Sequence, residues 1–341
     1  MSSSSPVKFL SPEEIASRQT ADVARLKFAE PAFVFKERAL RLRQLAAAHP
    51  MRDFLVFMAD VADAQHAALA AARTVRLPSE ELLHEAAGLG LPPLEFPRWM
   101  PGEAWQEDLQ ELLRQLQTRQ LPEPTRQVLA GLQSAGAAQL NLQAERLLSG
   151  VMLGLDYAAA PLTGAALQVY WTRLVGRTNA AFPDRAFSLI DNARICPCCG
   201  SQPVASVARL GGDDGTSRYL HCSLCQTEWH MVRIKCSHCE STKGISYQEL
   251  EPANDAARPA AMAPQGAVRA ECCDECGHYL KIVDMAKDPH VDPVADDLAT
   301  VALDLLVSET GKLRHGINYM LLWGEPSDDA QALESTHAGA P

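Results

Sequence analysis

The residues with the clearest chemistry in this sequence are cysteines. Eight of the ten form four Cys-x-x-Cys pairs: Cys196/Cys199, Cys222/Cys225, Cys236/Cys239 and Cys273/Cys276. A Cys-x-x-Cys turn places two sulfurs on one side of a tight loop, and two such turns that face each other supply the thiolates of a tetrahedral metal site. Four pairs so close together indicate bound metal rather than chance or a lone redox motif.

The spacing of the pairs predicts which of them share a metal. The gaps between pairs are 22, 10 and 33 residues. The two long gaps each suit a hairpin, so we predict that the first two pairs form site 1 and the last two form site 2. An interleaved pairing stays open. Gly200 and Gly277 follow two of the pairs directly, where a turn favours the left-handed backbone that glycine adopts easily.

Several other side chains near the pairs are candidates for a role. Cys198 and Cys272 are left over, and we interpret them as small residues beside metal loops, with redox chemistry as the alternative. Four histidines adjoin the pairs, and we place them around the sites rather than in them: His221, His230, His238 and His278.

The identity of the metal is open, because four thiolates suit both zinc and iron. In zinc-binding peptides the metal supplies ~10–16 kcal/mol of folding free energy. We therefore expect chelation, or Cys222→Ser, to unfold the cysteine region while the helical part survives. A closed four-sulfur site has no vacancy for water or substrate. Neither a phosphate-binding glycine loop nor a GxSxG motif is present in the sequence, so we predict neither an enzyme nor a small-molecule substrate.

The segment before the cysteines has the pattern of an all-helical bundle. Ser11 and Pro12 suit a helix start. Apolar residues recur at helical spacing after Pro31, after Pro50 and from Trp105 onward, and further helices are expected over 124–149 and 163–181. These stripes and their proline or glycine breaks predict about six to eight helices. In one of them the polar group Asp60, Asp63, Gln65 and His66 is interpreted as a solvated face.

The chain after the bundle divides into short segments. Two tandem β metal ribbons are expected, with the Pro/Ala-rich stretch 252–267 as a mobile loop inside the second. A final helix after Pro293 has the apolar stripe Val294, Leu298, Val301 and Leu305, with Asp296, Asp297 and Asp304 facing elsewhere. The predicted segments are a disordered lead 1–10, a helical domain 11–194, ribbons 195–233 and 234–288, a C-terminal helix and packing segment 289–325, and a disordered tail 326–341.

Composition narrows the classes of function. Apolar residues make up 47% and charged residues 21%, which suits a folded chain. The net charge of -11 argues against a general nucleic-acid binder. The start MSSSSPVKFL has no apolar core of a secretory signal, so we expect reduced thiols in the cytoplasm. The segment Tyr157–Thr172 is too short to span a membrane and is interpreted as a core helix.

A partner-binding surface is predicted on the first ribbon. Arg218, Tyr219, Trp229 and Arg233 belong to residue types that are enriched in binding hot spots. An alternative is a nucleic-acid-binding zinc-ribbon protein, in which a cluster around Tyr219 and Trp229 would bind the backbone and stack bases: Arg218, His221, His230, Arg233 and Lys235. The net charge disfavours this alternative.

Several longer stretches resemble a known family. CPCCGSQPVAS, RYLHCSLCQTEWHMVRIKCSHCE, ECGHYLKIVDMAKDP and VADDLATVALD, in this order, closely resemble the formate dehydrogenase accessory protein family, FdhE, and FKERALRLRQLAAAHPMRDFL resembles its helical region. The resemblance implies a cytoplasmic factor that binds the catalytic subunit of respiratory formate dehydrogenase before export. It also implies rubredoxin-like knuckles in which the eight paired cysteines hold metal, with iron favoured and zinc possible. A redox protein acting on that client is the alternative.

Overall fold

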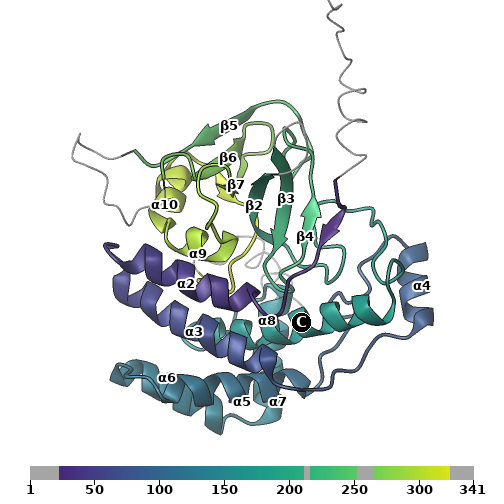
Figure 1. Ribbon diagram of the computed structural model, residues 1–341, viewed down its shortest axis with the longest axis vertical. Helices are drawn as coiled ribbons and strands as arrows, with labels where there is room; N and C mark the ends of the chain where they lie inside the picture. The colour runs from purple at the N-terminus through teal and green to yellow at the C-terminus, as the bar shows by residue number, and fades with distance from the viewer. Residues whose placement is uncertain (1–22, 211–215, 252–263, 323–341) are drawn as a thin grey trace, which may run out of the picture.

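The computed structural model describes residues 23–210, 216–251 and 264–322. A layer of helices lies against a mixed β-sheet, and two short helices pack on the sheet near the C-terminal end of the described chain (Figure 1). The predicted start at Ser11, the predicted lead and tail, and most of the predicted loop 252–267 lie outside the described residues.

Seven helices occupy the part of residues 23–194 that the structure describes. They are α2 (Val34–Ala46), α3 (Arg52–Ala70), α4 (Glu80–Gly88), α5 (Ala104–Gln117), α6 (Glu123–Ser134), α7 (Ala137–Ser149) and α8 (Ala160–Ala181). The helix expected over 124–149 is two helices, α6 and α7, because the chain is extended at Ala135 and Gly136 between them.

Helix α8 is the centre of the bundle. It is buried almost all round and contacts α3, α5 and α7. Its Arg173 forms a buried, two-pronged ion pair with Asp108 of α5, with N–O distances of 2.6 and 2.9 Å. Burial on nearly every face makes α8 a core element, in agreement with the core helix predicted for the uncharged segment Tyr157–Thr172.

The strands found in the described residues form one eight-stranded sheet. They are β1 (Leu26–Lys27), β2 (Pro203–Leu210), β3 (Thr216–Cys222), β4 (Glu228–His230), β5 (Ile245–Gln248), β6 (Val268–Cys273), β7 (His278–Asp284) and β8 (Leu313–Arg314). The order is β1-β4-β3-β2-β7-β6-β5, and β8 pairs with β7. All pairs are antiparallel except β2–β7 and β7–β8.

The two tandem ribbons predicted from the sequence are joined in one sheet. Ser206, Val207 and Ala208 of β2 pair in parallel with residues 282–284 of β7, so the two ribbons share a sheet. The segment assigned to the helical domain also contributes β1, which pairs with β4. Each addition covers a strand edge that would otherwise expose unpaired backbone groups.

The final helix of the sequence analysis is two short helices, α9 (Pro293–Leu298) and α10 (Val301–Glu309). The expectation that their aspartates face away from the core is wrong, because Asp296, Asp297 and Asp304 are all buried. Buried cations compensate them, since Arg41 pairs with Asp296 while Lys281 and Arg314 pair with the other two. Leu305 of the predicted apolar stripe is instead exposed.

The polar group of α3 is only partly a solvated face. Asp60 and Asp63 form ion pairs with Arg43 at the surface. Gln65, in contrast, is fully buried and donates hydrogen bonds to the carbonyl of Ala165 and to Gln168 of α8. It therefore joins α3 to α8.

Candidate metal centres

Site 1 gathers the four sulfurs of Cys196, Cys199, Cys222 and Cys225 within 4.8 Å of one another. The sulfurs of Cys196 and Cys225 lie 3.5 Å apart, and those of Cys199 and Cys222 lie 3.4 Å apart. A tetrahedron with metal–sulfur bonds of about 2.3 Å has sulfur–sulfur edges of about 3.8 Å. The two observed sulfur–sulfur distances are slightly shorter than these edges. A small outward movement of the sulfurs would give the tetrahedral geometry, so the four sulfurs could hold a metal ion.

Site 1 lies in the main core, between the sheet and the helices. All four of its cysteines are buried, and they share one apolar cluster with Trp171 of α8. Gln168 of α8 donates a hydrogen bond of 2.7 Å to the carbonyl of Ser223, inside the second turn. The backbone amide of Leu94 bonds the carbonyl of Cys198, inside the first turn. The helical layer therefore holds both metal turns directly.

Site 2 gathers Cys236, Cys239, Cys273 and Cys276 in the same way, with sulfur–sulfur distances of 3.7 Å across the site. Its setting differs, because Cys239 is exposed and Cys276 is half-buried. All ten cysteines are free, so none of these contacts is a disulfide. The two four-sulfur groups are those that the spacing predicted, and the ions that they bind stay a prediction.

The turns have the backbone that a metal knuckle needs. In site 1 the amides of Leu224 and Cys225 donate to the sulfur of Cys222, both at 3.3 Å. Gly200 and Gly277 are left-handed, with φ of 72° and 71°. Gln226 and Glu240 hold the equivalent positions of the other two turns at φ 62°. Of these four left-handed positions, only the two glycines were predicted from the sequence.

The burial of site 1 changes the pKa values of its four thiols. Burial raises the pKa of the Cys196, Cys199 and Cys222 thiols well above the usual value. Burial acts in the same direction on Cys225, but hydrogen bonds from neighbouring thiols outweigh it and lower the pKa of Cys225. Four thiolates gathered in so buried a site would need the positive charge of a metal cation.

Three histidines surround site 2. The rings of His238 and His278 stack at 3.8 Å, and His315 meets His238 edge-on at 5.1 Å. Possible ligand atoms of His238, Cys276 and His278 also lie within 4.8 Å of one another. Because the two stacked rings are nearly parallel, at 13°, their in-plane nitrogens do not converge on one point. This geometry favours the predicted place of His238 and His278 beside the site. His315 lies far from every cysteine pair in the sequence, so its place beside site 2 was not predicted.

The two unassigned cysteines lie in different surroundings. Cys198 is buried in the main core next to site 1. Cys272 is buried in a separate small cluster with Tyr279, Leu303 and Val307. Both positions fit a packing role, which stays a prediction.

The predicted partner surface is wrong for three of its four residues. Arg218, Tyr219 and Trp229 are each at most 3% exposed. Arg218 binds Ser206 and the carbonyl of Lys235, Tyr219 donates to the carbonyl of Ala24, and Trp229 donates to that of Ala193. Because their polar groups have hydrogen-bond partners within the protein, these three side chains can be buried. Arg233 is exposed, and its contact with a partner stays a prediction.

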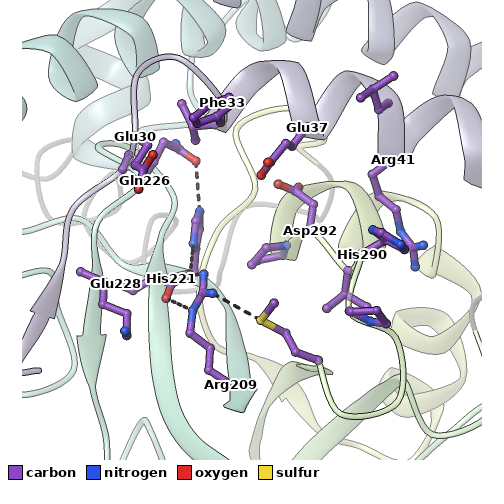
Figure 2. Close-up of a pocket in the computed structure, with 18 of the residues that line it drawn as sticks. Glu30, Phe33, Glu37, Arg41, Arg209, His221, Gln226, Glu228, His290 and Asp292 are labelled. Atoms are coloured by element: carbon purple, nitrogen blue, oxygen red, sulfur yellow. Dashed lines mark hydrogen bonds and ion pairs between the residues drawn. The ribbon is translucent and has the colours of Figure 1, made fainter. Parts of the chain in front are cut away.

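The structure reveals a pocket that the sequence analysis did not foresee. A cavity of about 810 Å³ lies between the start of α2, the strands β2 to β4 and the loop before α9 (Figure 2). Its lining comes from segments far apart in the chain, such as Glu37, Glu228 and Asp292. No local motif could have indicated it.

None of the helices in the described parts of the chain is both long enough and apolar enough to span a membrane.

The fold and the sites define a class of protein in which a helical layer packs on a sheet that carries two four-cysteine groups, each able to hold a metal ion. Three FdhE family models match the chain in succession: "FdhE, N-terminal" over 23–185, "FdhE, central domain" over 195–233 and "FdhE, C-terminal domain" over 234–321. The chain belongs to the FdhE family.

Curated relatives and a solved structure agree with this assignment. The "Protein FdhE homolog" of Edwardsiella ictaluri is 40% identical over 86% of this chain and 89% of its own length. That of Serratia proteamaculans is 38% identical over 94% and 98%. The crystal structure of the FdhE protein from Pseudomonas aeruginosa aligns with a TM-score of 0.77 at 35% identity, over 89% of this chain and 100% of that one.

Proposed function

We propose that this protein is a non-catalytic accessory factor that binds the catalytic subunit of a respiratory formate dehydrogenase in the cytoplasm. The factor acts on this client before the client is exported, and the client needs it to become active. The observation that carries the proposal is FdhE family membership along nearly the whole described chain, together with two closed four-sulfur centres. A metal bound by four thiolates offers no free position to a substrate, so the centres serve to shape a surface.

The metal would act structurally. In site 1 the four sulfurs, with the backbone amides of Leu224 and Cys225 beside them, would hold the ion, and the ion would fix β2, β3 and α8 relative to one another. When iron is bound, such a site can also exchange one electron; zinc has only the structural role.

The test combines genetics with capture of the client. Deletion of the gene is expected to abolish respiratory formate oxidation, and the tagged protein is expected to retain the catalytic subunit during purification. A deletion strain with full formate oxidation would refute the proposal. Plasmid-borne protein must restore activity, which controls for effects on neighbouring genes.

Electron exchange at site 2 is the second candidate function. The exposure of Cys239 favours it, because a partner could approach a site 2 ion more closely than one in the buried site 1. Protein loaded with zinc alone is then expected to bind the client but fail to support its activity. Full complementation by the zinc form would exclude this function.

A further inference from the structure

The pocket beside α2 carries more negative than positive charge. Arg209 and Glu228 neutralise each other, with an Nη2–Oε1 distance of 2.6 Å. Arg38 pairs with Asp292 at 3.2 Å. Lys27 lies over the Tyr219 ring at 5.2 Å.

Arg41 forms ion pairs with two carboxylates. It contacts Asp296 at 2.6 Å and Asp288 at 2.8 Å. Glu30 and Glu37, at the start of α2, have no ion-pair partner among the described residues, and both are exposed. The lining residues and their direct ion-pair partners together carry six carboxylates and four cationic side chains. The carboxylates are those of Glu30, Glu37, Glu228, Asp288, Asp292 and Asp296, and the cations are Lys27, Arg38, Arg41 and Arg209.

The carboxylates are placed to share one cation. Figure 2 shows the side chains of Glu37 and Asp292 pointing toward one another across the pocket. One oxygen of Asp292 is used by Arg38 and by the first amides of α9, at 2.7 to 3.2 Å. The other has no hydrogen-bond partner in the described parts of the chain, so it is available to a ligand.

Apolar side chains border this acidic centre. Phe33 is 48% exposed and Leu40 is 53% exposed, and both line the pocket with Val291. A cavity of about 810 Å³ has the size of a typical ligand site. A lone metal ion would leave most of this volume and its apolar border without contacts. A peptide segment with basic and apolar side chains would use both.

The pocket floor is continuous with site 1. His221 precedes the metal-site cysteine Cys222, and Gln226 follows Cys225. His221 contacts Gln226 at 3.1 Å and Glu228 at 3.2 Å, and Gln226 accepts a hydrogen bond from Arg38. The turn that presents two sulfurs to site 1 therefore also supports the pocket.

We propose that this pocket binds a basic segment of the client protein. An arginine or lysine side chain enters between Glu37 and Asp292, and adjacent apolar side chains cover Phe33 and Leu40. The identity of the partner rests on the proposed function. The chemistry of the segment rests on the pocket alone, because an uncompensated negative site in a partly apolar cleft attracts cationic, partly apolar ligands.

Peptide binding tests the chemistry. The probe is a rhodamine-labelled ten-residue peptide of alternating arginine and leucine, measured by fluorescence anisotropy with the metal-loaded full chain. A matched peptide carries citrulline, which keeps the size of arginine but lacks its charge. We expect binding that weakens with salt, and at least about tenfold weaker binding of the citrulline peptide. Equal binding of the two peptides would overturn the proposal.

Two double variants locate the peptide. Glu30→Lys/Glu37→Lys is expected to raise Kd by about tenfold or more. Glu103→Lys/Glu145→Lys changes the net charge equally at exposed positions of the helical layer outside the pocket, and it is expected to leave Kd within about twofold. An equal loss in both doubles, or displacement of the peptide by spermidine at equal concentration, would overturn the proposal.

Client capture separates this inference from the proposed function. If the wild-type chain retains the formate dehydrogenase subunit and Glu30→Lys/Glu37→Lys retains it equally well, the pocket is not the client site, while the function stands. If the wild-type chain retains no subunit, the proposed function fails and the peptide assay decides the pocket by itself.

Discussion

Arg218 of β3 and Glu271 of β6 form a buried ion pair with an Nη2–Oε1 distance of 2.7 Å. One residue belongs to the site 1 half of the sheet and the other to the site 2 half. Arg218 also binds Ser206 of β2, and Glu271 accepts a hydrogen bond from Tyr247 of β5. The pair thus joins the two halves, and it explains why Arg218 is unavailable to a partner.

Removal of one member of this pair should cost more than removal of both. We expect Glu271→Ala to lower the free energy of unfolding by about 3–5 kcal/mol, because it leaves Arg218 buried without its counter-charge. The double variant Arg218→Met/Glu271→Leu should be less destabilised. Urea unfolding of metal-loaded protein measures both, with Glu145→Ala as the surface control. A Glu271→Ala variant as stable as wild type would contradict the structural role of the pair.

The two metal sites should lose their ions at different rates. Cys239 is exposed and Cys276 half-buried, whereas all four cysteines of site 1 are buried. With excess EDTA we expect one equivalent of metal to leave quickly and the second to leave only as the core opens. Metal release followed by a colorimetric chelator checks this, and release of both equivalents in one phase would count against it.

Loss of site 1 should reach the helices. Its cysteines share a core cluster with Trp171 and Leu94. Because of this shared core, the helical part is not expected to survive Cys222→Ser unchanged. We now expect that variant to lower the melting temperature of the helical signal in circular dichroism. Cys239→Ser, at the exposed site, should change it much less. Equal melting of the helical signal in the two variants would show that the sites are equivalent.

Two glycines at equivalent positions offer a matched comparison. Both are left-handed, but a Cβ on Gly200 would lie 2.6 Å from Cγ of Glu95, whereas one on Gly277 would meet no atom within 4 Å. Gly277→Ala should therefore cost about 1 kcal/mol of backbone strain. Gly200→Ala should cost more, because Glu95 must also move. Urea unfolding and metal stoichiometry compare them, and a smaller effect at Gly200 would refute the contact.

Acidification should remove the contribution that the ionised Glu228 makes to the free energy of unfolding. Burial alone would raise the pKa of Glu228, but hydrogen bonds from His221 and Arg209 outweigh it and hold the pKa at about 2, below the ordinary 4.5. Because the folded pKa is depressed, the contribution is complete above about pH 4.5 and is lost as pH falls toward about 2. At neutral pH it amounts to roughly 3 kcal/mol.

The stability difference between wild type and Glu228→Gln measures this term. The difference should be largest near pH 7 and shrink below about pH 4.5. Comparing two proteins cancels the loss of metal that both undergo in acid. A difference that does not change with pH would mean that Glu228 acts by packing alone.

The sequence by itself determined the local features of this protein. Helical stripes, the four Cys-x-x-Cys turns and their division into two groups follow from short-range spacing, as do the left-handed glycines Gly200 and Gly277. Such features depend on neighbours in the chain, so periodicity and turn chemistry suffice to predict them.

Only the tertiary structure decided which residues meet across long separations. The parallel pairing of β2 with β7, the inward aspartates of α9 and α10 and the pocket beside α2 all join segments far apart in sequence. A charged side chain looks solvent-facing in a sequence unless its partner is known. Arg41 and Asp296 lie 255 residues apart, and their burial becomes favourable only when the fold brings them together.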